Sequence, residues 1–203
     1  MEDLYNIKDL IIIIVFSYIL GSIPFGYILT KVISSKNLLE IGSGSTGATN
    51  VTRALGLKIG IIVFLLDFCK GFILVLVLKQ TIDNNLLIAF TASSIIIGHC
   101  WPIFLKFKGG KGVAPGVGTF TALAYEIVLI PTIMSLIFIY KTKTASIGSL
   151  IGIVFSFIPF VVLIILNIYE IEYLIYYLVS ISVILFRHKE NINRLINNNE
   201  RSF

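Results

Sequence analysis

The chain has 203 residues, of which 57% are hydrophobic and 13% charged, with a mean hydropathy of +0.96 and a formal net charge of +5. Soluble domains carry about a quarter charged residues, so this composition excludes an ordinary soluble enzyme. No polar stretch is long enough to build a core of its own, and residues 1–203 are therefore expected to form one polytopic membrane domain.

Apolar runs approach the twenty residues that a helix needs to cross a bilayer. In chain order, the expected spans are 9–31, 59–78, 86–105, 113–124, 127–140, 147–166 and 173–186. The first span should be kinked where Ser22 and Pro24 interrupt it. The fourth and fifth spans are short. They could be two shallow helices that meet near Tyr125, or one long helix bent at Pro131.

Positive charge decides between these topologies, because short cytoplasmic loops are enriched in Lys and Arg. With seven spans, one set of loops holds Lys31, Lys36, Arg53, Lys58, Lys106, Lys108, Lys111, Lys141, Lys143, Arg187, Lys189, Arg194 and Arg201. The other set holds Lys8 and Lys79 beside the acids Glu2, Asp3, Asp9, Asp83, Glu126, Glu170 and Glu172. A six-span chain would place the 141–143 loop and the basic C-terminal tail outside. The sequence thus predicts an all-α integral membrane protein with about seven transmembrane helices, the N-terminus outside and the C-terminus cytoplasmic.

The first cytoplasmic segment, 34–57, is too polar to cross the membrane. Its centre runs from Gly42-Ser43-Gly44 to Asn50 and is rich in small and hydroxyl residues. Arg53 follows and would be within reach if a helix began near Asn50. Backbone N–H groups in such loops and at helix N-termini bind anions. A flexible linker is the alternative, but the adjoining polar residues favour a phosphate site in a loop packed at the cytoplasmic mouth.

A second cytoplasmic stretch combines lysine with glycine immediately before the span that begins at residue 113. It reads Lys106-Phe107-Lys108-Gly109-Gly110-Lys111-Gly112. Lysines beside a span are ordinary interfacial anchors, but anchoring does not need glycine. Glycines let backbone amides and an ammonium group converge on one phosphate, which favours a binding role.

A third polar stretch follows the last span. His188 and Asn191 lie three residues apart and would share a helix face. His188 could act as an acid, a base or a hydrogen-bond donor near neutral pH, or could be an ordinary interfacial histidine. We expect Arg187 and Arg194 to be interfacial anchors, and residues 197–199 to be a frayed tail.

Inside the apolar runs, Asp67 and Lys70 are expected to pair, because an unpaired charge at mid-membrane is costly. His99 ends the third span and could cap it or line a site. Cys69 and Cys100 also lie in or beside apolar runs. These cysteines and histidines lack the spacing of metal ligands, so no metal is expected.

These segments together resemble the bacterial acyl-phosphate-dependent glycerol-3-phosphate acyltransferases. The resemblance rests on ordered motifs along nearly the whole chain: Gly21-Ser22-Ile23-Pro24-Phe25-Gly26, Gly42 to Arg53, Asp67 with Lys70-Gly71, Gly98-His99 with Pro102, Phe107 to Ala114, and Arg187-His188 with Asn191-Ile192 and Arg194-Leu195.

The resemblance implies a seven-helix enzyme of the bacterial inner membrane, with its active site facing the cytoplasm. Its reaction moves a fatty acyl group from acyl phosphate to the 1-hydroxyl of glycerol 3-phosphate, giving lysophosphatidic acid and phosphate, with no metal, cofactor or thioester donor. The expected partners are these two substrates and membrane lipids, and no nucleic acid.

Ser43, Arg53, Lys111, His188 and Asn191 match residues that the family uses at its site. We expect Ser43, His188 and Asn191 to be catalytic. The expected substrate- and phosphate-binding residues are Gly42, Gly44, Asn50, Arg53, Lys108, Gly109, Gly110, Lys111 and Gly112. Either His188 or the leaving phosphate could accept the proton. Two other classes remain in play: a small transporter or channel for an organic phosphate, whose charged path would have to rely on Asp67 and Lys70, and a structural membrane scaffold.

Overall fold

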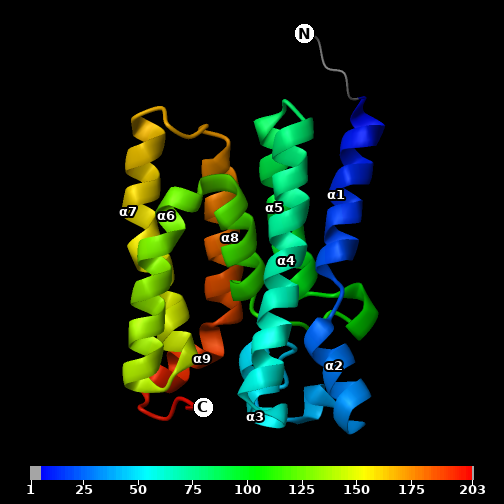
Figure 1. Cartoon of the computed structure of the whole chain (residues 1–203), viewed down its shortest axis with the longest axis vertical. Helices are drawn as coiled ribbons and strands as arrows, with labels where there is room; N and C mark the ends of the chain where they lie inside the picture. Colours follow the sequence, from blue (N-terminus) through cyan, green and yellow to red (C-terminus); the bar gives the residue numbers. More distant parts are fainter. Residues whose placement is uncertain (1–5, 203) are drawn as a thin grey trace.

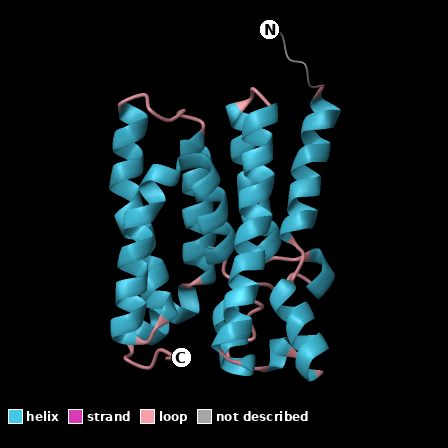
Figure 2. Ribbon diagram, viewed as in Figure 1, coloured by secondary structure: helices cyan, strands magenta, loops and turns pink. Residues whose placement is uncertain are grey.

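A computed structural model describes residues 6–202, and these residues form helices without strands (Figures 1 and 2). The expected acids Glu2 and Asp3 lie outside the described residues. The helices are α1 (Ile7–Gly21), α2 (Phe25–Ser34), α3 (Ala48–Leu55), α4 (Leu57–Thr81), α5 (Asn85–Cys100), α6 (Val113–Thr142), α7 (Ala145–Ile165), α8 (Tyr173–Arg187) and α9 (Lys189–Ile196), with short 3₁₀ helices η1 (Leu38–Glu40) and η2 (Ile103–Leu105). Within these described residues, and with α1 and α2 taken together, five segments are long and apolar enough to cross a membrane, and α8 is a shorter apolar helix.

The first apolar segment is broken at the expected place. Helix α1 ends at Gly21 and α2 begins at Phe25. Pro24 has no N–H to donate and cannot extend α1 without a clash. The break frees the carbonyl of Ile23, which accepts a hydrogen bond from Lys70 Nζ of α4 at 3.0 Å. The predicted kink is confirmed.

Helix α6 consists of two arms that meet at Ala124, whose backbone (φ −150°, ψ 62°) is not helical. The arms run in opposite directions, up to the bend and back down (Figure 1). At the bend, Lys79 Nζ of α4 donates to the carbonyl of Leu123 at 2.9 Å, and the Tyr169 hydroxyl donates to Glu126. The alternative of two helices meeting near Tyr125 is therefore confirmed, and Pro131 lies inside the second arm.

Helix α5 is shorter than the predicted span 86–105. It ends at Cys100, and Trp101 leaves the helical region with φ −131° and ψ 68°. A residue that precedes proline is pushed out of the α region, and Pro102 has this effect on Trp101. The apolar residues that follow form η2, and hydropathy alone did not separate them from the helix.

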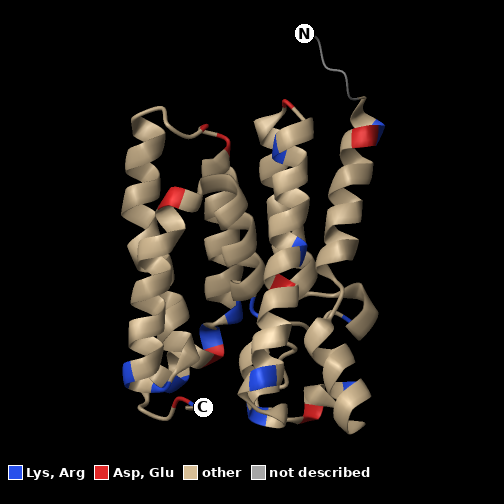
Figure 3. Ribbon diagram, viewed as in Figure 1, with Lys and Arg blue, Asp and Glu red and all other residues tan. Residues whose placement is uncertain are grey.

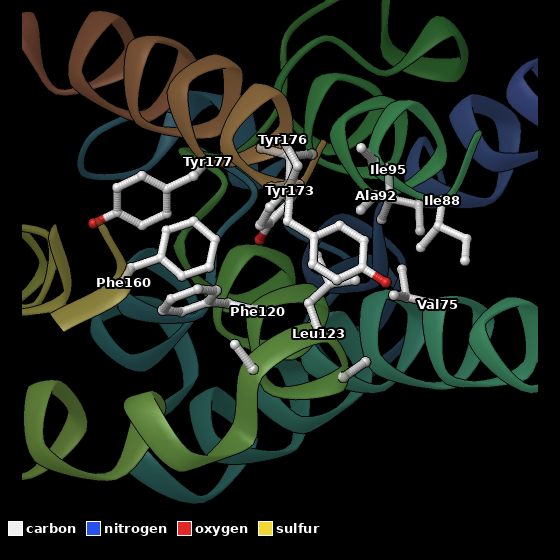
Figure 4. Close-up of a cluster of buried hydrophobic side chains, with 14 of the residues drawn as sticks. Val75, Ile88, Ala92, Ile95, Phe120, Leu123, Phe160, Tyr173, Tyr176 and Tyr177 are labelled. Atoms are coloured by element: carbon white, nitrogen blue, oxygen red, sulfur yellow. The ribbon is translucent and has the colours of Figure 1, made fainter. Parts of the chain in front are cut away.

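The core lies among α4, α5, α6, α7 and α8 (Figure 4). The Phe160 ring packs edge-on against Phe120, with centroids 5.2 Å apart, and lies 4.7 Å from Tyr177. Buried tyrosine hydroxyls in this core have hydrogen-bond partners: the Tyr176 hydroxyl, for example, lies 2.6 Å from the Thr119 hydroxyl. Many large apolar side chains are exposed on the outside of the bundle, as expected for helices that face lipid.

Charged residues are divided between the two ends of the bundle. Figure 3 shows most Lys and Arg at the end that carries α3, α9 and the close of α6, whereas the opposite end shows several acids and few basic residues. This is the grouping that the seven-span loop count predicts.

Candidate active site

A cavity of about 370 Å³ opens at the basic end of the bundle. Its walls come from segments far apart in the sequence: the 43–53 segment, α4, the start of α6, the α6–α7 turn, α9 and the C-terminal tail. Of the twelve predicted site residues, the cavity is lined by Ser43, Asn50, Arg53, Lys111, His188 and Asn191. The fold thus brings the three predicted polar stretches to one cavity.

The Gly/Ser-rich segment is held in shape by Asn50. The Asn50 amide nitrogen donates to the carbonyls of Ile41 and Ser45, both at 2.9 Å, and its oxygen accepts from the N–H of Ser43 at 3.0 Å. Asn50 was predicted to bind substrate, but these contacts engage its amide with the loop. Gly42 and Gly44 take φ values of +57° and +66° and shape the turn without lining the cavity. The expected helix starts at Ala48, so it carries Arg53 to the cavity.

Arg53 meets the C-terminal tail at the mouth of the cavity. Its guanidinium donates to the carbonyls of Ser202 and Arg201, at 3.2 and 3.3 Å. Burial and the nearby Arg201 lower the pKa of Arg53 from its usual value. A guanidinium that bonds only neutral carbonyls retains its charge for an anion.

The lysine–glycine stretch forms a tight loop against the end of α5. The N–H of Gly110 donates to the carbonyl of His99 at 3.0 Å, and a Cβ at Gly110 would overlap the His99 ring. Gly112 has φ +85° and starts α6. Arg187, expected to be an interfacial anchor, instead donates from Nε to the carbonyl of Gly110 and from Nη2 to that of Gly109, both at 3.0 Å.

Lys108 is the predicted phosphate ligand that the fold leaves outside. Its side chain is exposed and does not line the cavity. Lys106 and Phe107 both take left-handed conformations, with φ of 51° and 62°, and these turn the chain sharply before Lys108. Gly109, Gly110 and Gly112 are buried and do not line the cavity. From this stretch, the cavity lining includes Lys111.

Lys111, Asn191 and Glu200 form a chain of hydrogen bonds. Lys111 Nζ donates to Asn191 Oδ1 at 2.6 Å, and Asn191 Nδ2 donates to Glu200 Oε1 at 2.6 Å. Burial lowers the pKa of Lys111 to about 8, against the opposing attraction of Glu200. The ammonium is therefore mostly charged at neutral pH but is poised close to its titration.

His188 is buried at the junction of α8 and α9. Its Nδ1 lies 2.8 Å from the carbonyl of Ile184. A carbonyl can only accept, so Nδ1 carries the proton and Nε2 keeps a lone pair. Burial lowers the pKa of His188 to about 4. The ring is therefore neutral at physiological pH and offers the cavity an acceptor nitrogen.

Glu200 was not among the predicted site residues. Besides Asn191, its carboxylate accepts from Arg194 Nε at 2.8 Å and from the Ser146 hydroxyl at 3.1 Å. Arg201 donates to the carbonyl of Gly42 at 2.8 Å. Residues 197–199, which were expected to fray, instead make backbone hydrogen bonds to α9, and the residues after them are tied across the mouth of the cavity. The one feature of the sequence that could have pointed to Glu200 is that it is an acid in a stretch otherwise rich in Asn and Arg.

Asp67, Lys70 and His99 meet beneath the cavity, and Asp67 and His99 form part of its lining. Lys70 Nζ lies 2.7 Å from Asp67 Oδ1 and 3.1 Å from His99 Nδ1. The ammonium also donates to the carbonyl of Ile23. The predicted pairing of Asp67 and Lys70 is confirmed, and these bonds link α4 and α5 to the break between α1 and α2.

One side of the cavity is apolar. Leu57, Ile61 and Phe64 of α4 face Leu136 and Ile139 from the second arm of α6. Leu57, Ile61 and Leu136 are at least half exposed on the outer surface. The cavity therefore joins a polar end to an apolar wall that reaches the lipid-facing side. Within residues 6–202, no three His, Cys, Asp or Glu side chains gather as a metal site would require.

The chain matches the family described as glycerol-3-phosphate acyltransferase over residues 11–198. A glycerol-3-phosphate acyltransferase from Prochlorococcus marinus (strain MIT 9312) is 40% identical over 94% of this chain and 95% of its own length. The enzyme of that name from Aquifex aeolicus is 39% identical over 94% and 97%. The crystal structure of PlsY (YgiH), an integral membrane glycerol 3-phosphate acyltransferase, in its glycerol 3-phosphate form has a TM-score of 0.85 and 36% identity, with 96% of this chain and 95% of that chain covered. Its lysophosphatidic acid form has a TM-score of 0.82 at the same identity and coverage.

Proposed function

The chain belongs to the glycerol-3-phosphate acyltransferase family and so acylates glycerol 3-phosphate, and we propose that its donor is a fatty acyl phosphate and that the reaction takes place in the cavity lined by Ser43, Arg53, Lys111, His188 and Asn191. The observation that carries the proposal is the convergence of cations and hydrogen-bonding groups from three distant segments on one cavity beside an apolar wall. The solved relative in its glycerol 3-phosphate and lysophosphatidic acid forms gives the acceptor and the product.

Electrostatics supports a site for two phosphates. Each phosphate monoester carries about −1.5 to −2 charges at neutral pH, so two of them repel each other strongly in one cavity. Lys111 and Arg53 line the cavity, and Arg201 and Arg194 lie at its mouth. These cations offset the repulsion, while Glu200 holds Asn191 and Arg194 in place.

The reaction needs positioning more than activation, because acyl phosphate is already reactive. The 1-hydroxyl oxygen of glycerol 3-phosphate attacks the acyl carbon, a new C–O bond forms, and the C–O bond to phosphate breaks. Ser43 and backbone N–H groups stabilise the charge on the carbonyl oxygen. Lys111 and Asn191 hold the acceptor, and the acyl chain lies along Leu57, Ile61 and Leu136.

The leaving phosphate is the better proton acceptor. Its second pKa lies near 6, whereas burial lowers the pKa of His188 to about 4. A stronger base takes the proton more readily, so the hydroxyl proton ends on the phosphate. Before attack, His188 Nε2 accepts a hydrogen bond from the hydroxyl and aims its oxygen at the acyl carbon. As the C–O bond to phosphate breaks, the proton leaves this hydrogen bond and is bound by the departing phosphate.

In the proposed topology, each arm of α6 counts as one crossing, which gives seven crossings with the N-terminus outside. The cavity then faces the cytoplasm of a bacterial inner membrane. The basic end of the bundle supports this orientation through the excess of Lys and Arg in cytoplasmic loops.

The donor is tested with purified protein, glycerol 3-phosphate and either palmitoyl phosphate or palmitoyl-CoA. We expect phosphate and lysophosphatidic acid in equal amounts from the acyl phosphate, and no lysolipid from the thioester. Turnover of the thioester alone would contradict the proposal. Uptake of glycerol 3-phosphate into liposomes without either product would favour the transporter alternative.

A further inference from the structure

Arg187 contacts the lysine–glycine loop through two backbone carbonyls. Its Nε and Nη2 donate to the consecutive carbonyls of Gly110 and Gly109, both at 3.0 Å. The guanidinium also lies over the Trp101 ring, 5.6 Å from its centroid. A planar fork that meets two carbonyls and stacks on an aromatic ring has one orientation, and lysine cannot reproduce it.

These two bonds fix the direction of the peptide group that leads into Lys111. In a trans peptide, the N–H points away from the carbonyl of the preceding residue. Because the carbonyl of Gly110 points at Arg187, the N–H of Lys111 points away from it. Among the described residues, no acceptor takes the N–H of Lys111 or Gly112. Of these two residues, Lys111 lines the cavity, so its amide and its side chain can meet one anion there.

The end of α5 holds the same loop through His99. The N–H of Gly110 donates to the carbonyl of His99, and His99 is itself fixed by Lys70 Nζ at 3.1 Å. A Cβ at Gly109 would overlap the carbonyl of His99. The loop is therefore held both by the end of α5 and by Arg187.

We propose that Arg187 is a positioning residue that holds the carbonyls of Gly109 and Gly110 so that the Lys111 amide and ammonium bind the phosphate of glycerol 3-phosphate. Arg187 does not line the cavity, so no direct contact with substrate is assigned to it. Its action runs through the loop. This inference rests on the proposed function, because Lys111 bonds Asn191, which we assign to the acceptor.

Arg187 could instead favour anion binding only through its positive charge. A variant of Lys189 distinguishes this charge effect from the positioning role. Lys189 lies two residues further along the chain and is exposed, and its side chain makes no hydrogen bond or ion pair with another described residue. Lys189→Gln removes one positive charge at the same end of the bundle and leaves the loop intact. Arg187→Lys keeps the charge and removes the fork.

The test measures kinetics for wild type, Arg187→Lys, Arg187→Ala and Lys189→Gln in the same detergent. We expect the KM for glycerol 3-phosphate to rise about tenfold or more in both Arg187 variants, with the KM for acyl phosphate unchanged. Lys189→Gln should match the wild type. Guanidinium ion at tens of millimolar should lower the raised KM of Arg187→Ala and leave that of Arg187→Lys unaltered.

Fold is monitored by thermal unfolding in detergent, because Arg187 lies over the Trp101 ring and its replacement alters Trp101 emission directly. Wild-type kinetics in Arg187→Lys would overturn the proposal, as would equal increases in both KM values. Failure of Arg187→Lys to fold would also overturn it, because Arg187 would then be a structural residue.

If the wild type makes no lysolipid from acyl phosphate, the donor assignment fails independently. Binding of inorganic phosphate, followed through Trp101 emission, then tests the positioning role. Weaker binding in Arg187→Lys than in Lys189→Gln supports it, and equal binding overturns it.

Discussion

Burial affects two neighbouring site residues in ways that suit different tasks. It lowers the pKa of Lys111 to about 8 and that of His188 to about 4. Lys111 therefore keeps most of its charge at neutral pH and binds an anion, whereas His188 is neutral and accepts a hydrogen bond. The same physical effect leaves one group cationic and the other uncharged because their ordinary pKa values differ.

The pKa of Lys111 predicts a pH dependence of acceptor binding. The ammonium charge is present below pH 8 and is lost above it, whereas the substrate phosphate is already dianionic there. The KM for glycerol 3-phosphate should rise about fivefold over the pH unit above 8. Lys111→Arg keeps its charge and should show no such rise. A flat wild-type KM over that range, measured by steady-state kinetics, would contradict this role.

Glu200 fixes the orientation of Asn191 and should matter although it carries the wrong charge for an anion site. Glu200→Gln replaces one acceptor oxygen with a donor, so it loses a charge-assisted hydrogen bond worth about 1.5–3 kcal/mol. We expect kcat to fall about 10- to 100-fold. Glu190→Gln is the control, because Glu190 is exposed and lies 3.7 Å from Arg194. Equal activity of the two variants would remove Glu200 from the site.

At the scale of single residues, twelve site residues were predicted from the sequence, and six of them line the cavity. Lys111 and His188 were found because their residue types stand out beside apolar spans. Glu200 and Arg187 were missed because their roles depend on what the fold brings to them: a returning tail for one, and two carbonyls from a distant loop for the other. Lys108 was included on composition, and two left-handed residues turn the chain just before it.

At the scale of elements, the broken helices position the site. Hydropathy predicted the spans because lipid-facing helices must be apolar along their length. Hydropathy left open whether the chain breaks near Tyr125 or bends at Pro131; the count of Lys and Arg favoured the first, and the break lies at Ala124. Hydropathy extended α5 by five residues, because Ile103, Phe104 and Leu105 are apolar but follow Pro102. The C-terminal end of α5 is therefore determined by backbone conformation and not by composition.

The ammonium of Lys70 joins three of these elements, which predicts a non-additive effect on stability. Lys70→Met leaves the buried carboxylate of Asp67 without its cation and should cost about 3–5 kcal/mol. Adding Asp67→Asn removes the stranded charge, so the double variant should be more stable than Lys70→Met alone. Thermal unfolding in detergent measures both. Additive losses would show that the pair is not coupled.

At the scale of the whole molecule, the division of charge between the two ends predicts sidedness. Asp83 lies in the turn between α4 and α5, and Lys141 lies at the end of α6. A membrane-impermeant thiol reagent applied to intact cells should label Asp83→Cys and not Lys141→Cys. The wild-type chain is the control, because Cys69 and Cys100 lie within α4 and α5. Labelling of Lys141→Cys would contradict a cytoplasmic cavity.

The cavity brings together cations and hydrogen-bonding groups that lie up to about 150 positions apart in the chain, such as Ser43 and Asn191. Direct transfer between two anions requires that they be held there at the same time. The most direct measurement is phosphate release and lysophosphatidic acid formation from acyl phosphate by Lys111→Ala beside wild type, with both proteins shown to be folded by Trp101 emission. Equal amounts of the two products from wild type and none from Lys111→Ala are predicted. Wild-type turnover by the folded variant would contradict the assignment of this cavity as the site of acyl transfer.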